Sequence, residues 1–252
     1  MDSNLIKAGT ENFNLPHDVV PLPSGGIFYK NKKKSVKVGY LTANDENIII
    51  GGVSNPNVNV VTTLIRAKLY EVDIKPEELL EGDIEAILIY LRNTSFGPEY
   101  ILTLNDPVTN KPFEVTIILD ELNIIKPNVL PDENGHFNIK LPRSEVNVKL
   151  KPLTYGEILE LDKMVENYPS NLTAPRITWR LMKQIVEING ESDKEKISQM
   201  INNLPIMDSK FIKKFIKENE PSLDLKRVVK APSGAEVKLE VTFGVEFFRP
   251  FF

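Results

Sequence analysis

Cysteine is entirely missing from this chain of 252 residues, and histidine occurs only as His17 and His136. The lack of cysteine excludes disulfides, thiolate nucleophiles and metal sites built on cysteine. A structural zinc ion needs four donors, usually nitrogen or sulfur, which two histidines far apart in the sequence do not supply. We therefore expect no bound metal and no cofactor.

Long apolar runs and a basic surplus are missing too. No run approaches the roughly 20 apolar residues that span a bilayer, and the first residues lack the apolar segment of a signal peptide. The formal net charge is −4, whereas proteins that bind nucleic acid usually carry excess positive charge. We expect no membrane association, and the composition disfavours nucleic acid as a partner. Lys30 and Lys32-Lys33-Lys34 supply too few phosphate contacts to change this, and we expect them at a solvated hairpin tip.

Catalytic motifs are absent as well. The chain has no Gly-x-Ser-x-Gly elbow, and no third polar residue at a readable spacing orients the pair His17-Asp18. Asp83 and Asp208 each precede an apolar helical pattern, where we expect helix N-caps rather than catalytic carboxylates. We therefore predict that the protein is not an enzyme.

Two stretches of the chain repeat one pattern. Each begins with an aspartate, continues with apolar residues at spacings of three and four, and ends in a turn-rich segment with proline. The matched positions, 125 residues apart, are Asp83/Asp208, Ile87/Ile212, Tyr90/Phe215, Leu91/Ile216 and Pro107/Pro232. We interpret each copy as a helix that leads into a β-hairpin.

Earlier residues repeat as well, which favours an internal duplication. The run Val36-Lys37-Val38, with Leu41-Thr42 after it, recurs as Val148-Lys149-Leu150 with Leu153-Thr154 after it. Leu141-Pro142-Arg143-Ser144 likewise echoes Leu22-Pro23-Ser24. The alternative is that strand–helix–helix–hairpin segments all share such degenerate patterns.

These patterns predict an α+β protein with two similar halves, each with a β element, a helical bundle and a hairpin. We place a flexible N-terminus at residues 1–14, the first half at 15–126, a linker at 127–135 and the second half at 136–252. The expected helices include residues 58–71, 155–167, 175–188, 193–203 and 208–218. Paired strands are expected over 100–104 and 113–119, and a closing β segment over 227–243.

Three stretches, taken in order, resemble the baseplate hub and tail-assembly proteins of contractile-tailed bacteriophages of the T-even type. They are Leu22-Pro23-Ser24-Gly25-Gly26-Ile27-Phe28-Tyr29, the region from Leu80-Glu81-Gly82-Asp83 to Leu91-Arg92-Asn93-Thr94-Ser95-Phe96-Gly97, and Phe247-Phe248-Arg249-Pro250. The resemblance runs from about residue 19 to the end of the chain.

The resemblance implies two hairpins that look like zinc knuckles of the form Cys-Pro-x-Cys-Gly. The matching segments here are Asp106-Pro107-Val108-Thr109-Asn110 and Ala231-Pro232-Ser233-Gly234-Ala235. The vestigial ligand positions are then Asp106, Thr109, Ala231 and Gly234. The proline of the motif is present in both segments, and the cysteines are absent from both. We expect aromatic packing to replace the metal, from Phe243, Phe247, Phe248, Phe251 and Phe252.

The aromatic C-terminus has two interpretations. Its rings close the protein's own core, or they dock a partner, since terminal aromatics with an arginine suit an interface. Both can hold together, with Phe247 inward and the last pair outward. The predicted partner-binding residues are Phe247, Phe248, Arg249, Phe251 and Phe252.

The resemblance implies a non-enzymatic phage tail protein that acts in baseplate hub assembly, as an assembly chaperone or a small structural hub component. Its partners would be other tail, baseplate hub or tape-measure proteins. Its place would be the host cytoplasm during assembly, with the tail baseplate of the virion as the second location. The alternative function is a zinc-ribbon-like nucleic-acid-binding module that has lost its metal.

Overall fold

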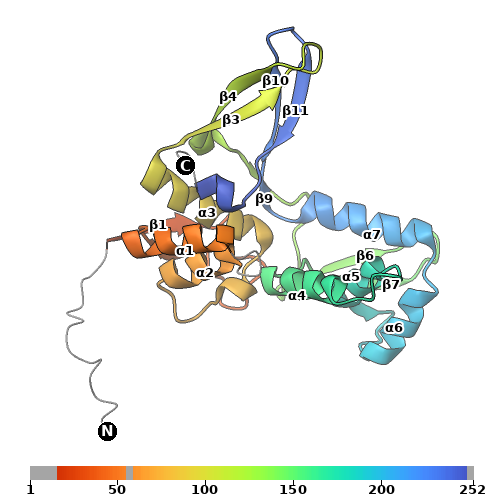
Figure 1. Ribbon diagram of the computed structural model, residues 1–252. Helices are drawn as coiled ribbons and strands as arrows, with labels where there is room; N and C mark the ends of the chain where they lie inside the picture. Colours follow the sequence, from red (N-terminus) through yellow and green to blue (C-terminus); the bar gives the residue numbers. More distant parts are fainter. Residues whose placement is uncertain (1–15, 55–58, 249–252) are drawn as a thin grey trace.

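The computed structural model describes residues 16–54 and 59–248. Figure 1 shows two bodies and an arm of β-hairpins that projects from the first body. Helices and several small sheets are mixed along the chain, which confirms the predicted α+β class. The predicted flexible segment 1–14 lies outside the described residues.

The first body contains a β-hairpin and three α-helices. Its elements are β1 (His17–Pro21), β2 (Ser35–Gly39), α1 (Ala43–Ser54), α2 (Val60–Lys68), a 3-10 turn η1 (Pro76–Glu78) and α3 (Glu81–Phe96). β1 and β2 pair antiparallel around the loop 22–34, as their alternating pattern predicts. At the start of α1, Asp45 accepts hydrogen bonds from N and Oγ1 of Thr42, both 2.7 Å long. The same carboxylate forms a buried ion pair with Lys68, which joins α1 to α2.

The arm consists of two hairpins from distant parts of the sequence. β3 (Glu99–Asn105) pairs with β4 (Pro112–Ile118), and β10 (Lys226–Lys230) pairs with β11 (Glu236–Glu240). The two hairpins lie side by side in Figure 1. Along β10 and β11 exposed and half-buried residues alternate, which is the pattern of sheets that cover one another on one face.

The second body contains a three-stranded sheet and four helices. Its elements are β6 (Phe137–Lys140), β7 (Asn147–Leu150), α4 (Tyr155–Glu166), α5 (Arg176–Gln184), β8 (Ile185–Ile188), α6 (Lys194–Asn202) and α7 (Ile206–Asn219). The prediction of one helix over 175–188 is wrong, because its last four residues form β8 and pair with β7. These residues are rich in β-branched side chains, and the strand buries Ile185 and Ile188 in the second core.

Short contacts join the two bodies. After β4 the chain makes a 3-10 turn, η2 (Leu119–Glu121), and then β5 (Ile124–Ile125), which pairs with β9 (Ser222–Leu223). The backbone N of Tyr155 donates to O of Leu79 at 2.7 Å. Gly82 of α3 permits the close approach of β9, because a Cβ atom at this position would lie 2.7 Å from Cα of Ser222.

Buried side chains form two separate cores. The buried members of the second core all come from residues 137–216, and Phe28 of the first body packs against them. The first core is drawn from residues 20–119 and is completed by Leu225, Val241, Phe247 and Phe248. Packing therefore groups the C-terminal hairpin with the first body, although it belongs to the second half of the sequence. Residues 127–135, all of them described, contain no helix or strand and lie between β5 and β6.

Candidate functional site

The tips of the two arm hairpins are joined by one carboxylate. Oδ1 of Asp106 accepts hydrogen bonds from N of Val108 (2.9 Å), N of Thr109 (3.2 Å) and Oγ of Ser233 (2.8 Å). Its Oδ2 accepts a further bond from N of Ser233 at 2.9 Å. Burial by itself raises the pKa of Asp106, but these hydrogen bonds outweigh it and lower the pKa to about 2. One side chain thus connects turns that lie far apart in the sequence.

The four positions that resemble knuckle ligands lie in these two turns. Asp106 and Thr109 belong to the β3–β4 turn, and Ala231 and Gly234 belong to the β10–β11 turn. The turns close alike, since N of Asn110 donates to O of Asp106 and N of Gly234 donates to O of Ala231, both at 2.8 Å. Within residues 16–54 and 59–248, no group of three or more His, Cys, Asp or Glu side chains is placed to hold a metal ion.

Of the predicted aromatic cluster, the described rings Phe243, Phe247 and Phe248 pack at the base of the arm and not at its tips. They lie in and before a 3-10 turn, η3 (Val245–Phe248). The ring centre of Phe247 lies 5.3 Å from that of Tyr100 in β3 and 4.9 Å from that of Phe243. Aromatic packing therefore fixes where the arm leaves the first body, while the polar contact of Asp106 joins the tips.

Phe247 and Phe248 belong to the first core, with 1% of each residue exposed. Arg92 of α3, also 1% exposed, ties this turn down by donating from Nε to O of Phe247 at 3.0 Å. Its other nitrogens donate to O of Gly97 at 2.8 Å and O of Glu99 at 3.1 Å. The two phenylalanines thus leave almost no surface for a partner. The other predicted partner-binding residues, Arg249, Phe251 and Phe252, lie outside the described residues.

Asp83 and Asp208 are not helix N-caps, contrary to the sequence-based expectation. Each is the third residue of its helix and is fully buried. Asp83 accepts bonds from N of Ser24 at 2.8 Å and from the Tyr29 hydroxyl. Asp208 accepts bonds from N of Arg143 at 2.8 Å and N of Ser144 at 2.9 Å. Both aspartates therefore bind the backbone of a Leu-Pro turn about 60 residues earlier, a contact that no local spacing reveals.

The pKa values of the two aspartates are shifted in opposite directions. Burial raises the pKa of Asp83 above its usual value. For Asp208 burial acts in the same sense, but the hydrogen bonds from Ser144 and Arg143 outweigh it and lower the pKa.

A cavity of about 590 Å³ lies between the two bodies and the base of the arm. Four glutamates line it, namely Glu81, Glu85, Glu220 and Glu240. Burial, reinforced by the neighbouring carboxylates, raises the pKa of Glu85 to about 8 and that of Glu220 to about 7. Cations line the cavity from the second body and the arm, namely Arg176, Arg180, Lys213, Lys217 and Lys226.

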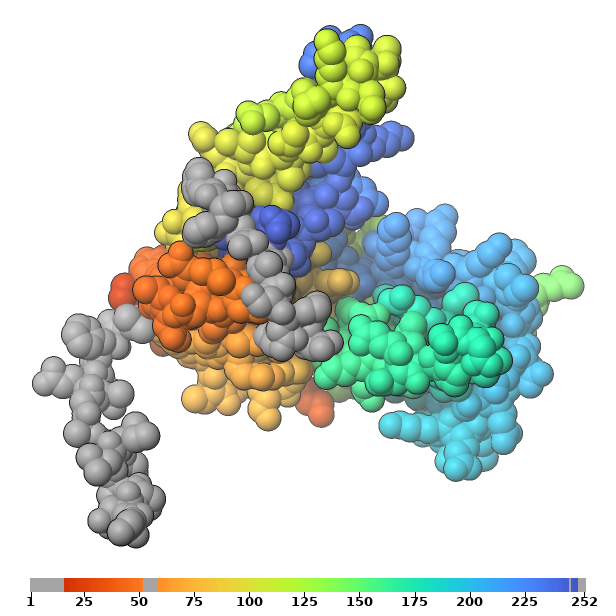
Figure 2. All heavy atoms as spheres, viewed as in Figure 1, coloured from red at the N-terminus to blue at the C-terminus, as the bar shows by residue number. Residues whose placement is uncertain are grey.

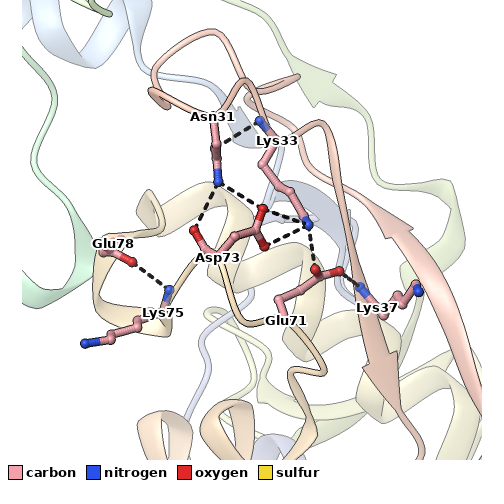
Figure 3. Close-up of polar contacts among 7 residues, drawn as sticks. All are labelled: Asn31, Lys33, Lys37, Glu71, Asp73, Lys75 and Glu78. Atoms are coloured by element: carbon pink, nitrogen blue, oxygen red, sulfur yellow. Dashed lines mark hydrogen bonds and ion pairs between the residues drawn. The ribbon is translucent and has the colours of Figure 1, made fainter.

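The lysine-rich loop between β1 and β2 is only partly a solvated tip. Lys30, Lys32 and Lys34 are exposed, as predicted. Lys33, however, is half-buried and forms ion pairs with Glu71 at 2.5 Å and Asp73 at 3.0 Å (Figure 3). The loop is therefore fastened to the segment that follows α2.

The described residues thus show a projecting arm, two cores and buried carboxylates that accept hydrogen bonds from backbone N–H groups. A family model described as T4 bacteriophage base plate protein matches residues 26–249. The chain belongs to this family, because the match covers most of its length. Searches of the curated proteins and of the solved structures gave no match.

Family membership assigns the protein a structural role in the phage baseplate. It also implies contacts with other baseplate or tail components. Within the described part of the chain, the helices are too short or too polar to cross a bilayer.

Proposed function

We propose that the protein acts without catalysis in the assembly of the baseplate hub, by gripping hub or tape-measure proteins. The family match over residues 26–249 carries this proposal. Hub assembly takes place in the host cytoplasm. The protein then stays in the baseplate as a small hub component or leaves it as a chaperone.

The contact we propose first is the C-terminal end, Arg249, Phe251 and Phe252. Support comes from the turn before it, where the Arg92 guanidinium and the first core hold Phe247 and Phe248. A short segment that follows a fixed anchor loses less conformational entropy on binding than a free tail would. Phe247 and Phe248 then serve as the anchor, and the residues after them reach the partner.

We further propose that the two halves arose by duplication of one module with a knuckle-like hairpin. Both halves run through two paired strands, helices and a hairpin in the same order. In both, an aspartate at the third position of the helix before the hairpin binds the backbone of a Leu-Pro turn. In this view Asp106 and Ser233 connect the two hairpins by hydrogen bonds at the positions where the zinc-knuckle resemblance would place metal ligands.

The contact can be tested by pull-down from phage-infected cells with the tagged full chain. We expect Phe251→Ser with Phe252→Ser to lose the captured tail proteins while the melting temperature stays unchanged. The matched control, Phe251→Tyr with Phe252→Tyr, keeps the rings and should keep the partners. Unchanged capture by the serine variant would contradict the proposed contact, and capture of no tail protein by the wild type would contradict the function.

Mass spectrometry of purified baseplates separates the two modes of action, because only a structural component is recovered with them. Salt-dependent binding of the purified protein to DNA would instead support the metal-less nucleic-acid-binding module.

A further inference from the structure

The outer face of α7 is a basic ridge. Its exposed lysines are Lys210, Lys213, Lys214 and Lys217. Spacings of three and four place all four on one side of the helix, opposite the buried Ile212 and Ile216. The ridge is strongly basic although the whole chain has a net charge of −4.

Acidic side chains of the chain itself leave this ridge largely uncompensated. Lys214 lies 3.7 Å from Glu218, and this is the one ion pair that the four lysines make within the described residues. The first two residues of α7, Ile206 and Met207, are 73% and 59% exposed. By helical spacing they fall on the same side as the lysines, so the face combines positive charge with an apolar end.

The ridge borders a recess and is open to a partner. Lys213 and Lys217 line the cavity between α7 and the base of the arm, together with Lys226 of β10. Figure 2 shows atoms of α7 at the surface on the side of the second body that faces the arm. A partner that lies along α7 can therefore also contact the arm.

We propose that this face of α7 docks an acidic, amphipathic segment of another tail protein. Carboxylates of the partner would meet the four lysines, and its apolar side chains would cover Ile206 and Met207. The inference rests on the proposed function, in which the protein works through protein–protein contacts.

Protein fits this face better than nucleic acid does. The lysines from 210 to 217 span only about 10 Å along the helix, which supplies fewer contacts than the roughly 6–10 phosphates of a strong DNA binder. Glu218 beside the ridge and Glu240 in the recess would repel a polyanion that follows the ridge. A phosphate backbone also offers nothing apolar to Ile206 and Met207.

The test uses the full chain and each tail protein of the phage, purified and screened one at a time. Two variants alter the face: Lys210→Glu with Lys214→Glu, and Ile206→Ser with Met207→Ser. The control, Lys30→Glu with Lys34→Glu, makes the same change in net charge at two exposed lysines of the β1–β2 loop. Melting temperatures verify that all three fold.

We expect both α7 variants to bind the identified tail protein at least about tenfold more weakly, with the control unchanged. Wild-type affinity should fall as salt rises, because the contact is largely ionic. Equal binding by the α7 variants would overturn this inference and leave the proposed function standing. Absence of any tail-protein binding by the wild type would overturn both, and so would a preference of the α7 face for duplex DNA.

Discussion

Asp106 is the residue on which the tip of the arm depends. Asp106→Asn keeps its shape but replaces one acceptor oxygen with a donor that faces backbone N–H groups. We expect the tips to separate more often, so amide hydrogen exchange at Ser233 and Thr109 should accelerate and the melting temperature should fall by a few degrees. Asp132→Asn is a suitable control, because Asp132 caps a turn of its own in the linker. Unchanged exchange at Ser233 would contradict the role of Asp106.

The same carboxylate predicts a response to acid. The pKa of Asp106 in the folded protein is about 2, below its ordinary value of 3.8. The stability that the Asp106 carboxylate gives the arm is therefore fully present above about pH 4 and is lost as the pH falls through 2.

Asp83 and Asp208 occupy matching positions, yet we expect substitution by asparagine to lower stability by different amounts at the two sites. Asp208→Asn turns an amide donor toward the N–H of Arg143 or Ser144 in a part-buried contact, which costs roughly 1–3 kcal/mol. Asp83→Asn is milder, because the Tyr29 hydroxyl oxygen can accept from the new amide. Urea unfolding of the two variants measures the difference, and equal losses would contradict it.

Among the elements, the C-terminal turn η3 depends most on a single side chain from outside it. Arg92→Ala leaves three carbonyl groups without their donor, and we expect the free energy of unfolding to fall by about 3 kcal/mol or more. Arg92→Lys should recover less than half of this, since an ammonium group cannot reach the three acceptors at once. Chemical denaturation measures both. The control is Arg66, which is exposed and forms a surface ion pair with Glu77, and Arg66→Ala should change stability by less than about 1 kcal/mol.

Elements whose signal is local could be predicted from the sequence. The apolar spacing after Asp83 and Asp208 indicated α3 and α7, and the alternating runs around Pro107 and Pro232 indicated the hairpins. β8 could not be separated from α5, because four residues of apolar pattern suit a helix end or a strand equally. Only the pairing with β7 decides between them.

On the scale of the whole molecule, the glutamates between the bodies predict a dependence on pH. Glu85 and Glu220 have raised pKa values in the folded protein, about 8 and 7 against 4.5 in a free side chain. Their contribution to stability is therefore complete below about pH 4.5 and is lost as the pH rises through 7 and 8. We expect the free energy of unfolding to fall by roughly 1–2 kcal/mol from pH 5 to pH 8, since water in the open cavity screens the charges.

Urea unfolding across this range measures the effect. Glu85→Gln and Glu220→Gln should flatten the profile, whereas Glu114→Gln, on an exposed arm position, should not. Glu81, Glu240 and Arg180 also act on these two groups and set the remaining slope. A profile that is the same in all variants would exclude the cavity as its source.

Contacts across the molecule were the part that the sequence could not predict. The bond from Ser233 to Asp106 spans 127 positions, and those to Asp83 and Asp208 span about 60. No periodicity connects such partners, so the sequence predicts caps at Asp83 and Asp208 and gives no signal for Ser233. The shared Leu-Pro motif before each aspartate was the one available signal, since it marks two turns that need the same acceptor.

The membership of the two cores bears on how the protein forms on the ribosome. Residues 137–216 bury their own side chains and can close as soon as they emerge. Residues 20–119 must wait for Leu225, Val241, Phe247 and Phe248, so the part made first is finished last. A purified fragment that ends near residue 220 should accordingly resist protease over 137–216 and be cut within 20–119.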